Sequence, residues 1–211
     1  ADLFGKGGSV EERANPIARA ILRPVESYNE RVLRKKAHGL TCICSHLYKM
    51  AQQLNFPDDQ LLLLHNGFNQ TISPRTSKLE ARQHFGINPD LHIAGSLGAF
   101  FNKDFQVLKS AIDYCQNQQS VAFLHIGQGD ALLQDANIIT TGRISDTELS
   151  LALQACDILL LPMADIPANH GRFPLKFSEY ISAGRPVLAT RIGDVPDFIE
   201  EHQCGYVSAP N

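Results

Sequence analysis

Short, continuously apolar segments alternate along this chain with segments whose apolar residues recur every three or four positions. A strand buried on both faces reads as a continuous apolar run, and a helix usually joins it to the next parallel strand. The alternation predicts the α/β class, a Rossmann-like parallel sheet with helices on both faces. We expect strands at 40–45, 61–64, 91–97, 121–126, 136–141, 158–162, 187–190 and 205–209, and helices at 23–37, 77–85, 104–116, 146–155, 173–183 and 194–202, with a further helix ending near 54.

Composition narrows the classes of partner. Of the 211 residues 44% are hydrophobic, which is enough for a core. The net charge of -3 and a pI near 6.2 give no electrostatic reason to expect a nucleic acid. We see no apolar run of membrane-spanning length and no signal peptide. Because the chain begins with Ala1 rather than Met, we interpret it as a fragment or a processed chain.

The cysteines and histidines give no metal-binding pattern. Five cysteines, at positions 42, 44, 115, 156 and 204, have no CxxC spacing, and the eight histidines are dispersed. We interpret the cysteines as buried free thiols in a reducing compartment and expect a cytoplasmic protein. The sequence therefore predicts no metal and no cofactor.

The segment HGRFPLKFSEYISAGRPVLAT, residues 170–190, predicts a loop, a short helix, a tight stop and a buried strand. Pro174 suits the first turn of a helix, and Phe177, Tyr180 and Ile181 form its apolar face. Gly184 supplies a left-handed end to this helix.

Lys176 and Glu179 lie three residues apart on that helix, one turn from the free N–H groups at its start. They form either an ordinary surface ion pair or part of a ligand site. A cation, a carboxylate and free amides suit a ligand that carries both a phosphate and a vicinal diol.

Ligands of a parallel sheet bind beyond the carboxyl ends of its strands, where small residues recur in this chain. The segment 127–129 reads GQG, but Leu132 stands at the third glycine position of a dinucleotide fingerprint, and we find no Walker A sequence. Lys103, Arg172 and Lys176 could together stabilise a departing diphosphate without a metal, and Glu179 could accept both hydroxyls of a ribose.

At this point the residues resemble a known family. The segment FPLKFSEYISAGRPVLAT is similar to the donor-site signature of the group 1 (family 4) retaining glycosyltransferases of the GT-B fold. Six weaker segments follow the family's order: LTCICS, LLLLHNGFN, IAGSLGAFFNK, LHIGQGD, TTGRISDTEL and ACDILLLP. The resemblance covers most of residues 37–210.

The resemblance implies a domain division and a donor site. Residues 1–69 would be the end of the acceptor-side N-terminal domain, 70–87 a linker and helix, and 88–211 the domain that binds the nucleotide-sugar. The catalytic residues stay unknown. The donor-binding residues would be Gly98, Lys103, Gly127, Gly129, Arg143, Ile144, Asn169, Arg172, Phe173, Pro174, Leu175, Lys176 and Glu179.

Two positions depart from the family pattern. Gly171 stands where the family has a glutamate that usually contacts the donor sugar, and Ser96 and Leu97 stand in place of an arginine. Asn169, Arg172 and Lys176 could replace these contacts, so the identity of the donor sugar is left open.

We therefore expect part of a glycosyltransferase that transfers a sugar from a nucleotide-diphospho-sugar, with retention and without a metal, and that is inactive as a fragment. The acceptor would be a glycan, a lipid-linked molecule or a small molecule. Whether the full-length protein associates peripherally with the inner face of a membrane is left open. The alternatives are a nucleotide-sugar epimerase of the same fold and a noncatalytic nucleotide-sugar-binding or partner protein.

Overall fold

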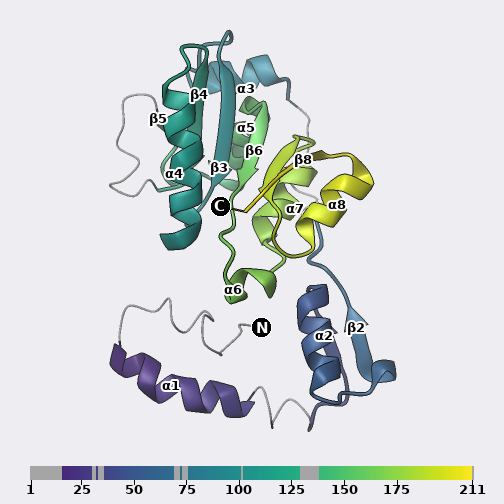
Figure 1. The fold of residues 1–211 in the computed structure, drawn as a ribbon. Coiled ribbons are helices and arrows are strands. Elements are labelled where there is room, and N and C mark those ends of the chain that lie inside the picture. Colours follow the sequence, from purple (N-terminus) through teal and green to yellow (C-terminus); the bar gives the residue numbers. More distant parts are fainter. Residues whose placement is uncertain are drawn as a thin grey trace. The chain divides into compact units, whose positions relative to one another are not determined.

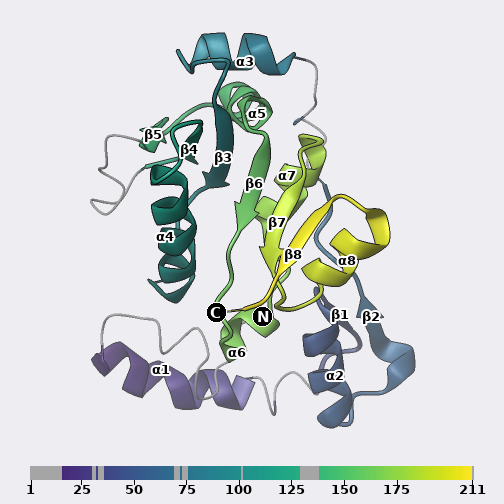
Figure 2. The same cartoon turned by 45° about the horizontal axis from the view of Figure 1, so that its top comes forward.

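The computed structural model describes residues 16–29, 32, 36–68, 72, 76–100, 102–128 and 138–210. The chain divides into two compact units, shown as ribbons in Figures 1 and 2. The first unit comprises residues up to Asn66 together with Asp165–Phe173 and Ile192–Asp194. The second unit comprises Gly67–Ala164, Pro174–Arg191 and Val195–Asn211. The division expected from the sequence falls after residue 69 and puts the two short segments 165–173 and 192–194 in the donor domain.

The second unit is built on a parallel sheet. Within the described residues its strands run in the order β5-β4-β3-β6-β7-β8, and every neighbouring pair is parallel. The central strands β3 and β6 lie side by side, so the strand order reverses between them, which is the usual place for a ligand. The strands are β3 (His92–Leu97), β4 (Val121–Ile126), β5 (Ile138–Thr140), β6 (Ile158–Leu161), β7 (Val187–Thr190) and β8 (Gly205–Ser208).

Helices cover both faces of this sheet, with α4 on one face and α5 on the other (Figure 1). The buried side chains of Phe105, Leu108 and Ile112 on α4 pack against Ala94, Phe123 and Leu160 of the sheet. This arrangement confirms the predicted fold class. The helices of the unit are α3 (Lys78–His84), α4 (Asn102–Gln116), α5 (Asp146–Ala155), α7 (Leu175–Ser182) and α8 (Val195–His202).

The first unit contains a smaller parallel pair, in which Leu40, Thr41 and Cys42 lie opposite Leu61, Leu62 and Leu63. Cys42, Cys44, Leu47, Ala51 and Phe56 form its buried cluster. The elements are α1 (Pro16–Tyr28), β1 (Leu40–Cys42), α2 (Ser45–Gln53), the 3₁₀-helix η3 (Asp58–Gln60), β2 (Leu61–Leu63) and α6 (Pro167–His170).

Three predicted elements differ from the structure. The helix expected at 23–37 begins at Pro16 and has Pro24 in its interior. The strand expected to reach residue 45 ends at Cys42, because Ser45 already begins α2. The segment 162–172, expected as loop, contains the four-residue helix α6, which is too short to show a helical period.

Most of the remaining elements lie within two residues of the prediction. The cysteines are free, and four of them are buried, as expected, with Cys204 partly exposed. Within the part of the chain that the structure describes, no helix is both long and apolar enough to cross a lipid bilayer.

Candidate functional site

A cavity of about 330 Å³ opens at the carboxyl ends of β3, β4 and β5 in the second unit. It is lined by the turns that follow these strands and by the first two turns of α5. The structure thus brings together four of the predicted residues, Gly98, Gly127, Arg143 and Ile144. The remaining lining residues are Leu97, Ala99, Ile126, Gln128, Gly142, Asp146 and Leu149.

Glycine is needed where two of these turns approach each other. Gly98 has φ +70° and Gly127 has φ +133°, both unfavourable for a residue with a side chain. A Cβ atom on Gly127 would lie 3.5 Å from the Cα of Gly98. Gly127 also forms an antiparallel bridge with Gly142. Gly98, Gly127 and Gly142 all line this glycine-walled cavity, and glycine lets a ligand approach the main chain closely.

A buried histidine of β4 holds these turns through hydrogen bonds. His125 is 2% exposed; its Nδ1 lies 3.1 Å from the hydroxyl of Ser96 and its Nε2 lies 3.3 Å from the carbonyl of Gln128. A carbonyl oxygen only accepts, so Nε2 carries the proton and Nδ1 accepts from Ser96. Sequence reasoning noted Ser96 only as a departure from the family's arginine and did not single out His125.

Lys176 reaches from α7 to the turn after β3. Its ammonium group lies 3.2 Å from the carbonyl oxygen of Ala99, to which it donates a hydrogen bond, and 4.0 Å from the ring centroid of Phe100. A cation over an aromatic face is electrostatically favourable. The positive charge predicted for the site is thus held beside the Gly98 turn.

Glu179 lies one turn further along α7 and is half-buried. Burial raises the pKa of Glu179, the charge of Lys176 lowers it, and the charge of Asp146 raises it. Asp146 is one of the residues that line the cavity. Among the described residues the structure gives the Glu179 carboxylate no hydrogen-bond donor, so a half-buried acceptor is available near the cavity.

The ends of α7 were predicted in part. Pro174 precedes the helix as its N-cap, with φ -64° and ψ 132°, and Leu175 is its first and largely exposed residue. The expected start at 173 is therefore two residues early. Gly184 has φ +65°, as its predicted role at the end of the helix requires.

The predicted residue Lys103 does not line the cavity. Lys103 lies in the first turn of α4 and is exposed. Its neighbour Asp104 is buried and accepts a hydrogen bond of 2.9 Å from the backbone N–H of Ala164, which fixes the segment that leaves β6. Gly129 lies outside the described residues.

Asn169, Arg172 and Phe173 belong to the first unit. Asn169 is fully buried, and its side-chain oxygen accepts a hydrogen bond of 2.7 Å from Arg172. Phe173 is also buried, and its ring stacks on that of His65 at 4.3 Å. Gly171, at the position of the family's glutamate, is the buried residue that ends α6.

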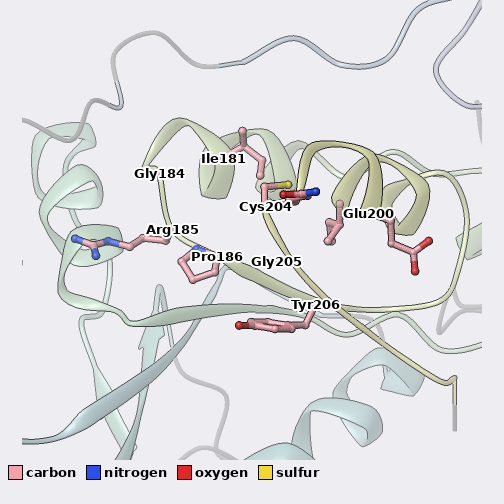
Figure 3. A pocket seen from close by; sticks show the side chains of 10 residues that line it. Ile181, Gly184, Arg185, Pro186, Glu200, Cys204, Gly205 and Tyr206 are labelled. Atoms are coloured by element: carbon pink, nitrogen blue, oxygen red, sulfur yellow. The ribbon is translucent and has the colours of Figure 1, made fainter.

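A larger hollow, of about 650 Å³, lies at the opposite, amino-terminal ends of β7 and β8 (Figure 3). None of the predicted site residues lines it. Figure 3 shows the ring of Tyr206 beside Pro186 and Gly205. Because ligands of parallel sheets bind at the carboxyl ends of the strands, the smaller cavity is the candidate site.

The part of the chain that the structure describes contains no group of three or more His, Cys, Asp or Glu side chains placed to hold a metal ion. The charged side chains that line the cavity or lie near it are instead those of Arg143, Asp146, Lys176 and Glu179.

Solved structures share the fold at low sequence identity. Sucrose-phosphate synthase from Thermosynechococcus elongatus is 18% identical, with a TM-score of 0.71 over 96% of this chain and 52% of that one. Anabaena Alr3699/HepE in complex with UDP and glucose is 17% identical, with a TM-score of 0.68 over 93% of this chain and 55% of that one. Both likenesses concern the GT-B fold.

Sequence comparison gives the family. The chain is 26% identical over 199 residues to a Bacillus subtilis (strain 168) protein described as "Putative teichuronic acid biosynthesis glycosyltransferase TuaH", covering 87% of this chain and 47% of the relative. The chain therefore spans about half the length of these relatives. The sequence profile described as "Glycosyl transferases group 1" matches residues 88–211, which is more than half of the chain. The chain belongs to the group 1 glycosyltransferases.

Proposed function

We propose that this chain is the part of a glycosyltransferase that binds a nucleotide-diphospho-sugar, from which the whole protein transfers the sugar to an acceptor with retention and without a metal. The observation that carries the proposal is the glycine-walled cavity of the second unit, with Lys176 fixed beside the Gly98 turn and Glu179 half-buried one helical turn away.

The chemistry of these groups fits the two ends of a nucleoside diphosphate. A carboxylate without a hydrogen-bond donor can accept from both hydroxyls of a ribose, in a charge-assisted contact. Lys176 and the free N–H groups at the start of α7 suit the diphosphate, whose negative charge grows as the sugar departs. Lys103, in the same unit, is the further cation that we assign to this role.

The relatives support the same assignment. HepE was solved in complex with UDP and glucose, and another structure of it holds UDP-glucose. We therefore place uridine nucleotides first among the donors to be tested. The acceptor stays in the broad class of glycans, lipid-linked molecules and small molecules.

The test is thermal unfolding of the chain with UDP, GDP, ADP, TDP and their sugars. A ligand at a hundred times its dissociation constant adds about 2.7 kcal/mol to the free energy of unfolding, which raises the melting temperature by several degrees. We expect one nucleotide series to do so, and Glu179→Ala to abolish the shift.

Glu201→Ala is the matched control, because Glu201 is an exposed glutamate on α8 and does not line the cavity. A shift that Glu179→Ala and Glu201→Ala preserve equally would remove Glu179 from the site. If no nucleotide or nucleotide-sugar shifted the melting temperature, the donor-binding proposal would fail and a noncatalytic partner protein would be the better interpretation.

A further inference from the structure

The His125 side chain orients the main chain of the turn that follows β4. Its Nε2 donates a hydrogen bond of 3.3 Å to the carbonyl of Gln128, a residue that lines the cavity. Because only 2% of His125 is exposed, this bond turns the Gln128 oxygen toward the interior of the unit. The Ser96 hydroxyl lies 3.1 Å from Nδ1 and donates to it, which keeps the proton on Nε2.

The Thr141 hydroxyl holds the turn that follows β5. It accepts a hydrogen bond of 3.1 Å from the backbone N–H of Gly127 and donates one of 2.9 Å to the carbonyl of Gly142. The backbone N–H of Thr141 also donates to the carbonyl of His125, at 3.1 Å. One side chain therefore joins the glycine turns after β4 and β5 and engages the carbonyl of the second.

The turn after β3 is held in the same way. The backbone N–H of Gly98 donates to the carbonyl of Ile126 at 2.8 Å, and Lys176 donates to the carbonyl of Ala99 at 3.2 Å. Protein donors thus engage the carbonyl oxygens of four residues that line the cavity, namely Ala99, Ile126, Gln128 and Gly142.

These carbonyl groups matter because the side-chain charges around the cavity cancel. Arg143 and Asp146, which line it, carry opposite charges, and so do Lys176 and Glu179 on the neighbouring helix α7. A carbonyl oxygen is the negative end of a peptide dipole, so a carbonyl turned toward a bound phosphate would repel it. The direction of the peptide groups therefore decides whether the wall accepts an anion.

We propose that Ser96, His125 and Thr141 are positioning residues, which hold the carbonyl oxygens of the glycine turns away from the cavity so that its wall takes a phosphate group. This inference rests on the proposed function, in which the cavity binds a nucleoside diphosphate. It assigns the preference for phosphate to three side chains that do not themselves line the cavity.

Matched substitutions separate these contacts from general support of the fold. His125→Phe keeps a ring and removes the donor to Gln128, whereas His125→Gln replaces that donor with an amide. Thr141→Val keeps the shape of the side chain and removes the hydroxyl. Thr190→Val is its control: the buried Thr190 hydroxyl accepts from the N–H of Met163 at 2.8 Å and donates to its carbonyl at 2.7 Å, and neither residue lines the cavity.

The first measurement is NMR titration of the full chain with uridine, UMP and UDP, or with the same series of the base that binds best. We expect His125→Phe and Thr141→Val to weaken UDP about three- to tenfold, the factor that one hydrogen bond carries, and uridine less than about twofold, with UMP between them. His125→Gln should recover most of the UDP affinity. Thr190→Val should leave all three affinities unchanged.

The dependence on phosphate charge distinguishes positioning from a loss of shape. A cavity that had only lost its shape would bind uridine, UMP and UDP more weakly by one common factor. That outcome, or an unchanged UDP affinity of His125→Phe, would overturn the inference while the proposed function stood. A wild-type chain that bound no nucleotide would overturn both.

The second measurement is the tautomer of His125, read from the chemical shifts of its imidazole nitrogens. Wild type should carry the proton on Nε2, and Ser96→Ala should shift the proton toward Nδ1 and weaken UDP. In the His125→Phe background, Ser96→Ala should weaken UDP no further, because Ser96 acts through His125. A wild-type His125 with its proton on Nδ1 would contradict the proposal.

Discussion

The hydroxyl of Tyr180 on α7 accepts a hydrogen bond of 2.9 Å from the backbone N–H of Leu97, the last residue of β3. The same hydroxyl lies 3.3 Å from the carbonyl oxygen of Leu160 on β6, to which it donates. Tyr180 is fully buried, and burial raises its pKa, so the hydroxyl keeps its proton at neutral pH. One side chain thus ties the helix that carries Lys176 and Glu179 to the two central strands.

Tyr180→Phe should destabilise the chain by about 1–3 kcal/mol, because the Leu97 N–H and the Leu160 carbonyl would lose a partner in a buried place. Urea unfolding measures this cost. Tyr114→Phe is the control: Tyr114 is 69% exposed on α4 and should change the free energy of unfolding by about 0.5 kcal/mol or less. Equal midpoints for the two variants would contradict the role of the Tyr180 hydroxyl.

A second buried connection lies at the other end of the same strands. Arg82 of α3 is 3% exposed and donates to the Asp157 carboxylate at 2.6 Å, while the backbone N–H of Ile93 donates to the same oxygen at 2.7 Å. Asp157→Ala would leave the guanidinium buried without its carboxylate, at a cost of about 3–5 kcal/mol. Denaturant unfolding gives the value.

Lys78 provides the comparison for Asp157, since it donates to the same carboxylate from an exposed position. Lys78→Ala should cost at most about 1 kcal/mol, the value of a solvated ion pair. If the two alanine variants unfolded at the same denaturant concentration, the buried Arg82 would not depend on Asp157.

The contrast between these contacts and the helix caps shows what the sequence could predict. The helix expected at 146–155 begins in the structure with a complete capping box between Ser145 and Glu148. A cap involves residues three positions apart, so its pattern is visible in the sequence. Gly184 and the glycine turns at Gly98 and Gly127 were predicted for the same local reason.

Contacts between distant residues leave no such pattern. Asp194 was interpreted as the start of a helix, and its bond to Ser45 spans 149 positions. His125 and Tyr180 were each placed in an element by periodicity alone, which shows that a residue is buried but not which atom its polar group meets. The cavity could be located from strand ends, whereas its supporting hydrogen bonds required the structure.

Lowering the pH should reduce the free energy of unfolding, because Asp157 becomes protonated. Burial alone would raise the pKa of Asp157, but hydrogen bonds from Lys78 and Ile93 and the charge of Arg82 lower it. A carboxyl with a lowered folded-state pKa binds protons more readily in the unfolded chain, so its stabilisation is complete above the unfolded pKa of about 3.9 and is lost as the pH falls through the folded one. We expect the stability difference between wild type and Asp157→Asn to shrink from pH 6 to pH 3. Parallel stability curves over this range would contradict the assignment.

Glu179 should show the opposite dependence, because burial raises its pKa. The folded chain then holds the Glu179 proton more tightly than the unfolded chain, so the carboxylate destabilises the fold increasingly as the pH rises above the unfolded pKa. Glu179→Gln removes this cost and should unfold at a higher denaturant concentration than wild type at pH 7, with little difference at pH 4.

The same Glu179→Gln variant should bind the nucleotide-sugar more weakly, because an amide cannot accept hydrogen bonds from both ribose hydroxyls as a carboxylate does. A residue that is costly to the fold and needed for the ligand is what a binding site requires. Denaturant unfolding at pH 7 and pH 4 measures the stability difference, and calorimetry at pH 7 measures the affinity. A variant that was less stable at pH 7 and bound the nucleotide-sugar normally would show that Glu179 serves the fold alone.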